Sequence, residues 1–242
     1  MSLLKTLRNN LGPEHRLFRV LTSGIGEVIM VMVGVLLALC VQNWNDDRKD
    51  TVKETKLLRE MRENLNADLT DCRWNIDFNE RALHANRNVL RHLEERTPYT
   101  DTMRIHYATL FGCTQLVANT SAFDNLKSIG FNLIRTDSLR KGITGLYAER
   151  YRFVAMTESE YDTHLQMVDM GPHIYSKLVV ETVWKSAYPI DVEALSGDNG
   201  FKGVLRMNIF TKGFMTGIYK AVERQVQALI TLIDAELEQR RP

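Results

Sequence analysis

The chain has 242 residues, with 31 Lys and Arg against 30 Asp and Glu, which gives a formal net charge of +1. This near-neutral balance excludes the strongly basic surface of a typical nucleic-acid-binding protein, so we expect no nucleic-acid partner. With only 5 Pro and 14 Gly, the composition argues against an all-β fold with many turns and favours helix.

Residues 1–23 form a basic stretch that predicts a segment at a membrane surface. Pro13 is suited to opening a helix, and after it Arg16 and Arg19 alternate with apolar residues such as Phe18. An amphipathic helix of this kind places its apolar face in the lipid boundary and its arginines near anionic headgroups. We therefore expect Arg16, Phe18 and Arg19 to contact membrane lipids.

The next stretch, GEVIMVMVGVLLALCVQNWNDDR, holds the long apolar run of the chain. Residues 28–41 alone rise about 21 Å as a helix, which is short of the roughly 30 Å hydrocarbon core. A transmembrane helix over residues 24–45 is long enough, and it puts Glu27 near one interface and Trp44 at the other, where an indole is favoured. A cleaved leader or a lipidated Cys40 is the weaker alternative, because a long flank precedes the run and a large residue precedes the cysteine.

Five residues of the predicted span share one helical face: Glu27, Gly34, Ala38, Gln42 and Asn45. At about 100° per residue they fall within an arc of roughly 80°. Gly34 and Ala38 form a small-xxx-small pair that lets a second helix approach closely, and the polar ends of the face could hydrogen-bond to it. The face predicts a helix–helix contact with a copy of the chain or with another membrane protein. Chance spacing is the alternative.

Basic residues flank the predicted span on both sides, and the counts of Lys and Arg alone slightly favour the opposite orientation to the one that we expect. The short tail is basic and contains one acid, Glu14, which favours an N-terminus in the cytoplasm. A long C-terminal domain can cross a membrane despite its charges. We expect a single-pass protein of the bacterial inner membrane, with residues 46–242 as a periplasmic helical domain.

Residues 46–96 contain neither Pro nor Gly, and their apolar residues recur at close to seven-residue spacing. They predict one long helix, continuous with the span or briefly broken near Asp46, that ends before Pro98. After the Gly-Pro-His tripeptide at residues 171–173 we expect a new helix, and we expect no sheet. The further helices are predicted over residues 102–111, 121–128, 138–168, 174–187 and 204–239. Short connections between successive helices imply an antiparallel bundle, so the expected fold class is all-α.

Two stretches, GEVIMVMVGVLLALCVQNWNDDR and AFDNLKSIGFNLIRTDSLRKGITGLY, resemble a bacterial family of single-pass membrane proteins known only as a domain of unknown function. The layout of that family is similar to this chain: a basic tail, a span that opens with Gly-Glu and closes with an Asn-Trp-Asn-like tripeptide, a long polar helix, and a turn before a further helix. The resemblance implies marked positions in the span and the turn, and it brings no known activity. These positions are Glu27, Asn43, Trp44 and Asn45 in the span, and Leu126, Gly130 and Ile134 at the turn.

Motifs for nucleotide binding, metalloprotease or serine-hydrolase chemistry are absent from the sequence. His84 and His92 lie about two helical turns apart, and a solvated surface explains them better than a metal-binding face. Solvation is also the simplest interpretation of Glu158 and Glu160. Four aromatic residues at helical spacing predict core packing rather than a cofactor site: Tyr147, Tyr151, Phe153 and Tyr161. We therefore expect no catalytic residue, no metal and no cofactor.

Three cysteines occur without CxxC or Cys/His ligand spacing. Three unpaired, buried thiols are the simplest interpretation. A disulfide between Cys72 and Cys113 is the sharper alternative, and it requires an oxidising compartment.

These features predict a non-enzymatic protein that works by association. The leading hypothesis is an accessory or scaffold subunit of a larger inner-membrane complex, whose partners are membrane lipids and other membrane subunits or copies of itself. A homo-oligomeric channel with rings of Glu27 and a sensor of external ligands that needs a partner for its output are the alternatives.

Overall fold

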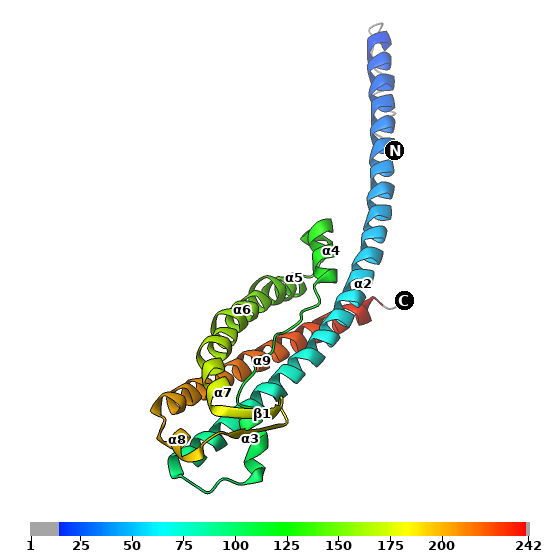
Figure 1. Cartoon of the computed structure of the whole chain (residues 1–242). Coiled ribbons are helices and arrows are strands. Elements are labelled where there is room, and N and C mark those ends of the chain that lie inside the picture. The colour runs from blue at the N-terminus through cyan, green and yellow to red at the C-terminus, as the bar shows by residue number, and fades with distance from the viewer. Residues whose placement is uncertain (1–14, 241–242) are drawn as a thin grey trace. The chain divides into compact units, whose positions relative to one another are not determined.

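The computed structural model describes residues 15–240, with side chains from Glu27 onward, and its elements carry the labels of Figure 1. The chain divides into two compact units, Met1–Lys53 and Glu54–Pro242, and the division falls inside the long helix α2 (His15–Glu95). Residues 1–14 of the predicted membrane-surface segment lie outside the described residues. The side chains of Arg16, Phe18 and Arg19 do so as well.

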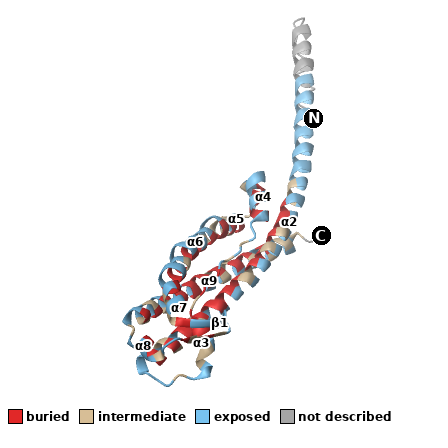
Figure 2. Cartoon of the chain, in the orientation of Figure 1, coloured by how far each residue is buried: buried red, intermediate tan, exposed pale blue. Residues whose placement is uncertain are grey.

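Unit 1 presents a bare helix from Glu27 onward. Every residue from 27 to 49 is exposed, as Figure 2 shows. The helix contains an 18-residue window with a mean hydropathy of 1.8, none of it buried. By length and composition, this helix could cross a membrane.

Unit 2 holds the rest of α2 and all later elements, which are almost entirely helical, so the predicted all-α class is confirmed. In chain order these are the 3₁₀ turn η1 (Asp101–Met103), α3 (Arg104–Ala108), α4 (Ser121–Ile129), the 3₁₀ turn η2 (Phe131–Leu133), α5 (Asp137–Thr144), the π-helix η3 (Gly145–Arg150), α6 (Tyr151–Thr157), the π-helices η4 (Glu158–Thr163) and η5 (Leu165–Met170), α7 (Gly171–Lys177), β1 (Leu178–Thr182), β2 (Ser186–Pro189), α8 (Val192–Gly197) and α9 (Asn199–Gln239).

Three helical stretches form the frame of unit 2: α2, the run from α5 to α7, and α9 (Figure 1). α9 is antiparallel to α2, since Arg62 pairs with Asp234 while Glu94 pairs with Arg206. α9 is also antiparallel to the run from α5 to α7, since Arg150 bonds Gln225 while Gln166 bonds Asn208. The α5–α7 run therefore lies parallel to α2. The predicted antiparallel bundle is therefore modified, because an extended connection carries the chain back along α2 before α4 begins.

Two buried apolar clusters fill this frame, and Figure 2 shows the buried residues on the inner sides of the helices. The larger cluster joins α2 between Leu57 and Ile76 to α4, α5, α6 and the second half of α9. The smaller one joins Val89 and Leu93 of α2 to α3, α7, the hairpin and the start of α9. Together they fix both ends of the three-helix frame.

The predicted helix over residues 174–187 is wrong beyond Lys177. The chain instead forms an antiparallel hairpin of β1 and β2, with Val179 opposite Tyr188, so the expectation of no sheet is also wrong. The run LVVET is rich in β-branched residues, which favour a pleated strand over a helix. The hairpin turn includes Trp184, which has a positive φ of 59°.

The predicted break at residues 171–173 is wrong too. Met170 has helical φ and ψ angles, and Pro172 sits in the first turn of α7, where its missing N–H is not needed. The last helix begins at Asn199, earlier than the predicted residue 204. Asp198 starts it by accepting a hydrogen bond from Phe201 N at 2.9 Å.

Candidate functional site

The buried polar side chains of unit 2 gather around one extended segment, residues 110–120, which connects α3 to α4. The segment passes along α2, and it pairs with neither strand of the sheet among the residues that the structure describes. Buried backbone N–H and C=O groups need hydrogen-bond partners. Side chains of the surrounding helices supply them here.

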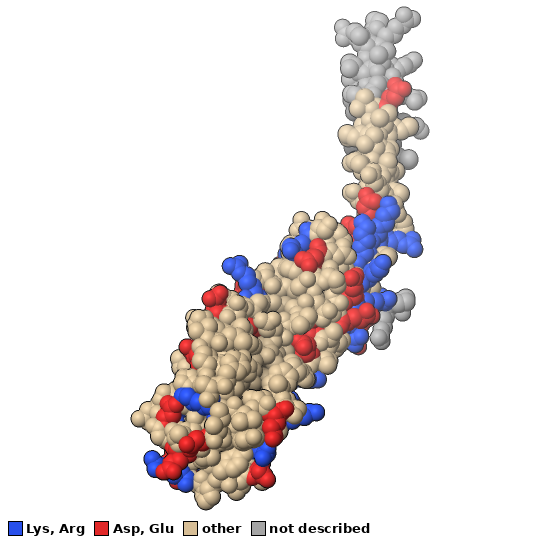
Figure 3. All heavy atoms as spheres, viewed as in Figure 1, with Lys and Arg blue, Asp and Glu red and all other residues tan. Residues whose placement is uncertain are grey.

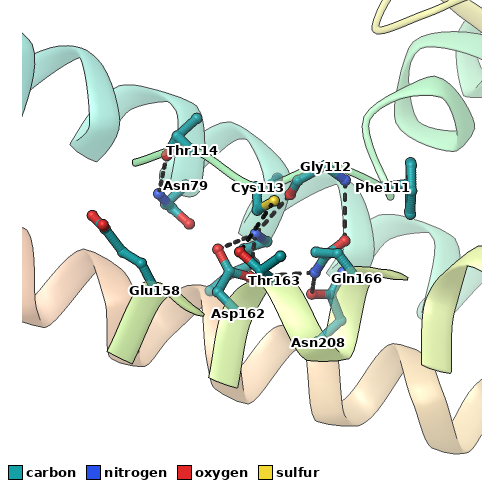
Figure 4. Close-up of polar contacts among 12 residues, drawn as sticks. Asn79, Phe111, Gly112, Cys113, Thr114, Glu158, Asp162, Thr163, Gln166 and Asn208 are labelled. Atoms are coloured by element: carbon teal, nitrogen blue, oxygen red, sulfur yellow. Dashed lines mark hydrogen bonds and ion pairs between the residues drawn. The ribbon is translucent and has the colours of Figure 1, made fainter. Parts of the chain in front are cut away.

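Three helix side chains close around the first part of the extended segment (Figure 4). The carbonyl oxygen of Leu110 accepts from Asn208 Nδ2 at 2.9 Å, and that of Gly112 accepts from Lys212 Nζ at 2.8 Å. The N–H of Gly112 donates to Gln166 Oε1 at 3.0 Å. Gln166 Nε2 donates to Asn208 Oδ1 at 2.7 Å, so the polar groups of η5 and α9 also bind each other.

Carboxylates bind the second part of the segment. Each accepts a hydrogen bond from one backbone N–H: Glu158 from Leu116 at 2.8 Å, Asp71 from Val117 at 2.9 Å, and Asp68 from Asn119 at 2.8 Å. Hydrogen bonds to an ionised acceptor are stronger than neutral ones. The segment is thus tied both to α2 and to η4.

Lys212 and Asp162 form an ion pair in the interior. Their side chains are 0% and 1% exposed, and Lys212 Nζ lies 2.7 Å and 2.9 Å from the two carboxylate oxygens. Burial lowers the pKa of Lys212, and the charge of Asp162 opposes that shift. The ammonium group of Lys212 donates to both carboxylate oxygens of Asp162 and to the carbonyl of Gly112. The pair therefore holds the extended segment through the carbonyl of Gly112.

Burial acts on two of the carboxylates that bind the extended segment, Glu158 and Asp68. Desolvation raises the pKa of Glu158, and hydrogen bonds from Tyr219 and Leu116 oppose the shift. Desolvation likewise raises the pKa of Asp68. Tyr219 OH donates to Glu158 at 2.7 Å. The phenol therefore partly compensates the cost of burying this carboxylate.

Glu158→Gln should remove a pH-dependent cost from the fold. A raised pKa means that the folded state binds the proton more tightly than the unfolded state, so Glu158 destabilises the fold as the pH rises above its ordinary pKa of 4.5. The amide oxygen of Gln can accept the same two hydrogen bonds. The stability of the variant relative to wild type should therefore increase with pH and level off above the raised pKa, as measured by urea unfolding at a series of pH values. The exposed Glu160→Gln is the control, and an equally flat difference for both variants would contradict the expectation.

An aromatic cleft opens beside this network, between α2, α3 and the hairpin. It has a volume of about 460 Å³. Phe78 packs edge-on against Trp184 with ring centroids 5.6 Å apart, and Trp74 continues the wall at 5.9 Å from Phe78. The other lining residues are Asp77, Glu80, Arg81, His84, Ala85, Ile105, His106 and Thr109. The acids at this cleft are already paired, Asp77 with Arg81 and Glu80 with Lys220.

Gly112 joins the network to the cleft. Its φ of +134° favours glycine, and a Cβ at this position would lie 2.9 Å from Trp184 Nε1 and 3.2 Å from Phe78. Trp184 Nε1 donates to the carbonyl of Phe111 at 3.2 Å, so the indole closes over the backbone of the extended segment. The cleft wall therefore depends on a glycine whose own carbonyl is bound by Lys212.

Charged side chains of both signs are interspersed over unit 2 on the face shown in Figure 3. Many are paired across helices, as Arg73 is with Glu223 and Lys220 with Glu80. Such exposed pairs contribute little each. The distinctive polar chemistry of unit 2 lies in its interior and at the cleft.

The predicted helix-contact face lies exposed on α2, and its residues are Glu27, Gly34, Ala38, Gln42 and Asn45. The predicted membrane-interface residue Trp44 is exposed as well. No heavy atom lies within 4 Å of a Cβ built at Gly34, apart from the helix's own backbone and chain neighbours, so the groove is open to another helix. The contact itself stays a prediction.

The candidate disulfide between Cys72 and Cys113 is not formed, and both thiols are free. Cys72 faces α9 and donates to the carbonyl of Tyr219 at 3.2 Å, while Cys113 faces η4 and accepts from Thr163 at 3.8 Å. Burial raises the pKa of Cys72 to about 12, which makes its thiol inert. The prediction of unpaired thiols is confirmed, but only Cys72 is buried, since Cys113 is half-buried and Cys40 is exposed.

Two residues expected on a solvated surface are buried. His92 is 4% exposed, with its Nδ1 2.8 Å from Thr97 Oγ1, and Glu158 is 2% exposed. Among the aromatic residues predicted to pack in the core, Tyr147 and Tyr151 do so. Two do not, since Phe153 and Tyr161 are exposed.

Sequence reasoning missed the polar residues around the extended segment, although α9 carries a signal for them. Its buried stripe includes Leu205, Asn208, Lys212, Met215 and Tyr219, at helical spacing. Polar residues at two positions of an otherwise apolar stripe indicate buried hydrogen-bond partners. An analysis that counts apolar residues alone passes over them.

Residues 27–181 match the model of a family of unknown function, DUF6090. No curated protein and no solved structure matches the chain. The matched range includes the apolar stretch of α2, the cleft residues on α2 and α3, and the extended segment.

Proposed function

The chain belongs to this DUF6090 family of unknown function, and from that premise we propose that it is a non-enzymatic, single-pass membrane protein that works by association. In this proposal it is an accessory or scaffold subunit of a larger bacterial inner-membrane complex. Its N-terminus lies in the cytoplasm and its helical domain in the periplasm, an orientation that rests on the short basic tail. Its partners are membrane lipids and other membrane subunits or copies of itself.

The bare apolar helix of unit 1 carries the proposal. Large apolar side chains such as Val28, Met30 and Leu37 are more than 60% exposed. A continuous uncovered surface of this kind is unfavourable in water and is suited to lipid. Within it, Gly34 and Ala38 lie on the face where a second helix can approach.

The use of the interior polar groups supports a non-enzymatic role. Lys212, Asp162 and Glu158 are buried groups with the chemistry of general acids or bases, and each is bound to the extended segment or to its partner. A catalytic group must reach the proton that it transfers. These groups face the protein's own backbone.

The test is the native mass of the full chain, with identification of co-purifying proteins, after extraction in a mild detergent. Gly34→Ile adds bulk on the proposed contact face and should reduce the assembly to the monomer. Leu36→Phe adds bulk on the opposite face of the same helix and should leave the mass unchanged. Retention with unrelated subunits would support the scaffold role.

Other outcomes separate the alternatives. A pure ring of this chain that conducts ions in a bilayer would replace the scaffold role with a channel. A wild-type protein that stays in the soluble fraction, or one that runs as a monomer alone, would overturn the proposal.

A further inference from the structure

Two histidines from different helices meet at the aromatic cleft. His84 and Asn88 lie one turn apart on α2, and His106 of α3 faces them. Asn88 Nδ2 is 2.9 Å from His84 Nε2 and 3.2 Å from His106 Nε2, and the two imidazole rings have centroids 5.5 Å apart. Three side chains that can ligate a metal thus converge on one point.

One assignment of these hydrogen bonds gives both rings the form that binds a metal. When the amide N–H groups of Asn88 donate to both Nε2 atoms, the proton of each neutral imidazole is on Nδ1. That tautomer directs the Nε2 lone pairs of His84 and His106 at the same small volume, which is the form in which Nε2 binds a metal. A neutral imidazole is the form that ligates a metal.

The two distances from the Asn88 amide to the rings are close to those between the ligands of a metal ion. A tetrahedral site with metal–ligand distances of about 2.0–2.1 Å separates its ligands by roughly 3.3–3.4 Å. The separations of 2.9 Å and 3.2 Å from the Asn88 amide need to open by a few tenths of an ångström. A half-turn of the amide exchanges its nitrogen and oxygen, and Oδ1 then becomes the third donor.

The surroundings leave room for the rest of a coordination shell. His84 is exposed and lines the open cleft, so water or a small ligand can occupy the remaining positions. Within the described residues, no group of three or more His, Cys, Asp and Glu side chains is placed to hold a metal. The amide of Asn88 is therefore needed as a ligand, and we expect weaker affinity than at a structural zinc site.

From this geometry we propose that His84, Asn88 and His106 bind one divalent transition-metal ion at the edge of the aromatic cleft. Imidazole ligands suit copper, zinc and nickel, and the general order of affinities makes Cu²⁺ the tightest of the three. The ion would join α2 to α3 and expose its open positions to the cleft. This site is independent of the proposed scaffold role, and either can fail alone.

The test is calorimetric titration of the purified full chain in detergent with Cu²⁺ and with Zn²⁺. We expect one equivalent to bind, with Cu²⁺ tighter. His84→Ala and His106→Ala should each weaken binding at least tenfold, while the exposed His164→Ala on another helix should not change it. The electron paramagnetic resonance spectrum of the Cu²⁺ form should show two imidazole nitrogens in wild type and one in each single variant.

A fourth variant keeps the test decisive if an alanine change disturbs the fold. Asn88→Asp replaces the amide oxygen by a charged carboxylate oxygen at the same place and should tighten binding of Zn²⁺. Saturable binding that survives both histidine changes would overturn the site. A wild-type protein that binds no better than the His84→Ala/His106→Ala double variant would do the same.

Discussion

Lys212→Met should lower the free energy of unfolding by about 3–5 kcal/mol, because it leaves a carboxylate buried without its counter-charge. Asp162 is 1% exposed, so water cannot replace the lost ammonium without opening the bundle. The carbonyl of Gly112 loses its donor in the same change. Urea unfolding of the full chain in detergent, followed by tryptophan fluorescence, measures the loss.

Lys220→Met is the matched control, two turns away on the same helix. Lys220 pairs with Glu80, and both side chains are about half exposed, so its removal should cost less than about 1 kcal/mol. Adding Asp162→Asn to Lys212→Met removes the orphaned charge and should recover part of the loss. Equal effects of the two lysine changes would show that the interior pair does not hold the fold.

Gly112→Ala should lower the free energy of unfolding by about 2–3 kcal/mol, because it strains the backbone at φ +134° and displaces the Trp184 indole. The new Cβ would meet Trp184 Nε1 at 2.9 Å, so the hydrogen bond to Phe111 should break. The expected signature is a loss of stability together with a shift in tryptophan emission as the indole moves into solvent.

Gly130→Ala separates the two causes of that loss. Gly130 also has a positive φ, +112°, but nothing lies within 4 Å of its Cβ position. Gly130→Ala should therefore lower the free energy of unfolding by about 1–2 kcal/mol through backbone strain alone. Its tryptophan emission spectrum should stay unchanged. If Gly112→Ala is no worse than Gly130→Ala and leaves the fluorescence unchanged, the close approach of Trp184 is unimportant.

Local signals account for the parts of the fold that could be predicted. The absence of Pro and Gly from residues 46–96 predicted the long helix, which ends at Glu95, close to the expected stop before Pro98. Gly130 ends α4 as predicted. In each case the determining residues lie within a few positions of the feature that they determine.

The failures are of two kinds. The run from Leu178 to Thr182 is too short for periodicity to separate a strand from a helix, so its β-branched residues and its pairing with β2 decide. The burial of residues 110–120 depends on partners far away in sequence, such as Asn208 for Leu110. The interior site therefore had no local signature beyond polar residues in apolar stripes.

The extended segment also bears on how the chain is made. Asn208 and Lys212 bind Leu110 and Gly112 across separations of 98 and 100 residues. A ribosome releases residues 110–120 well before it releases α9, so the peptide groups of the segment wait for partners that do not yet exist. The family match ends at residue 181, before any of α9. We expect unit 2 to fold only after α9 has been synthesised, and to need protection from aggregation until then.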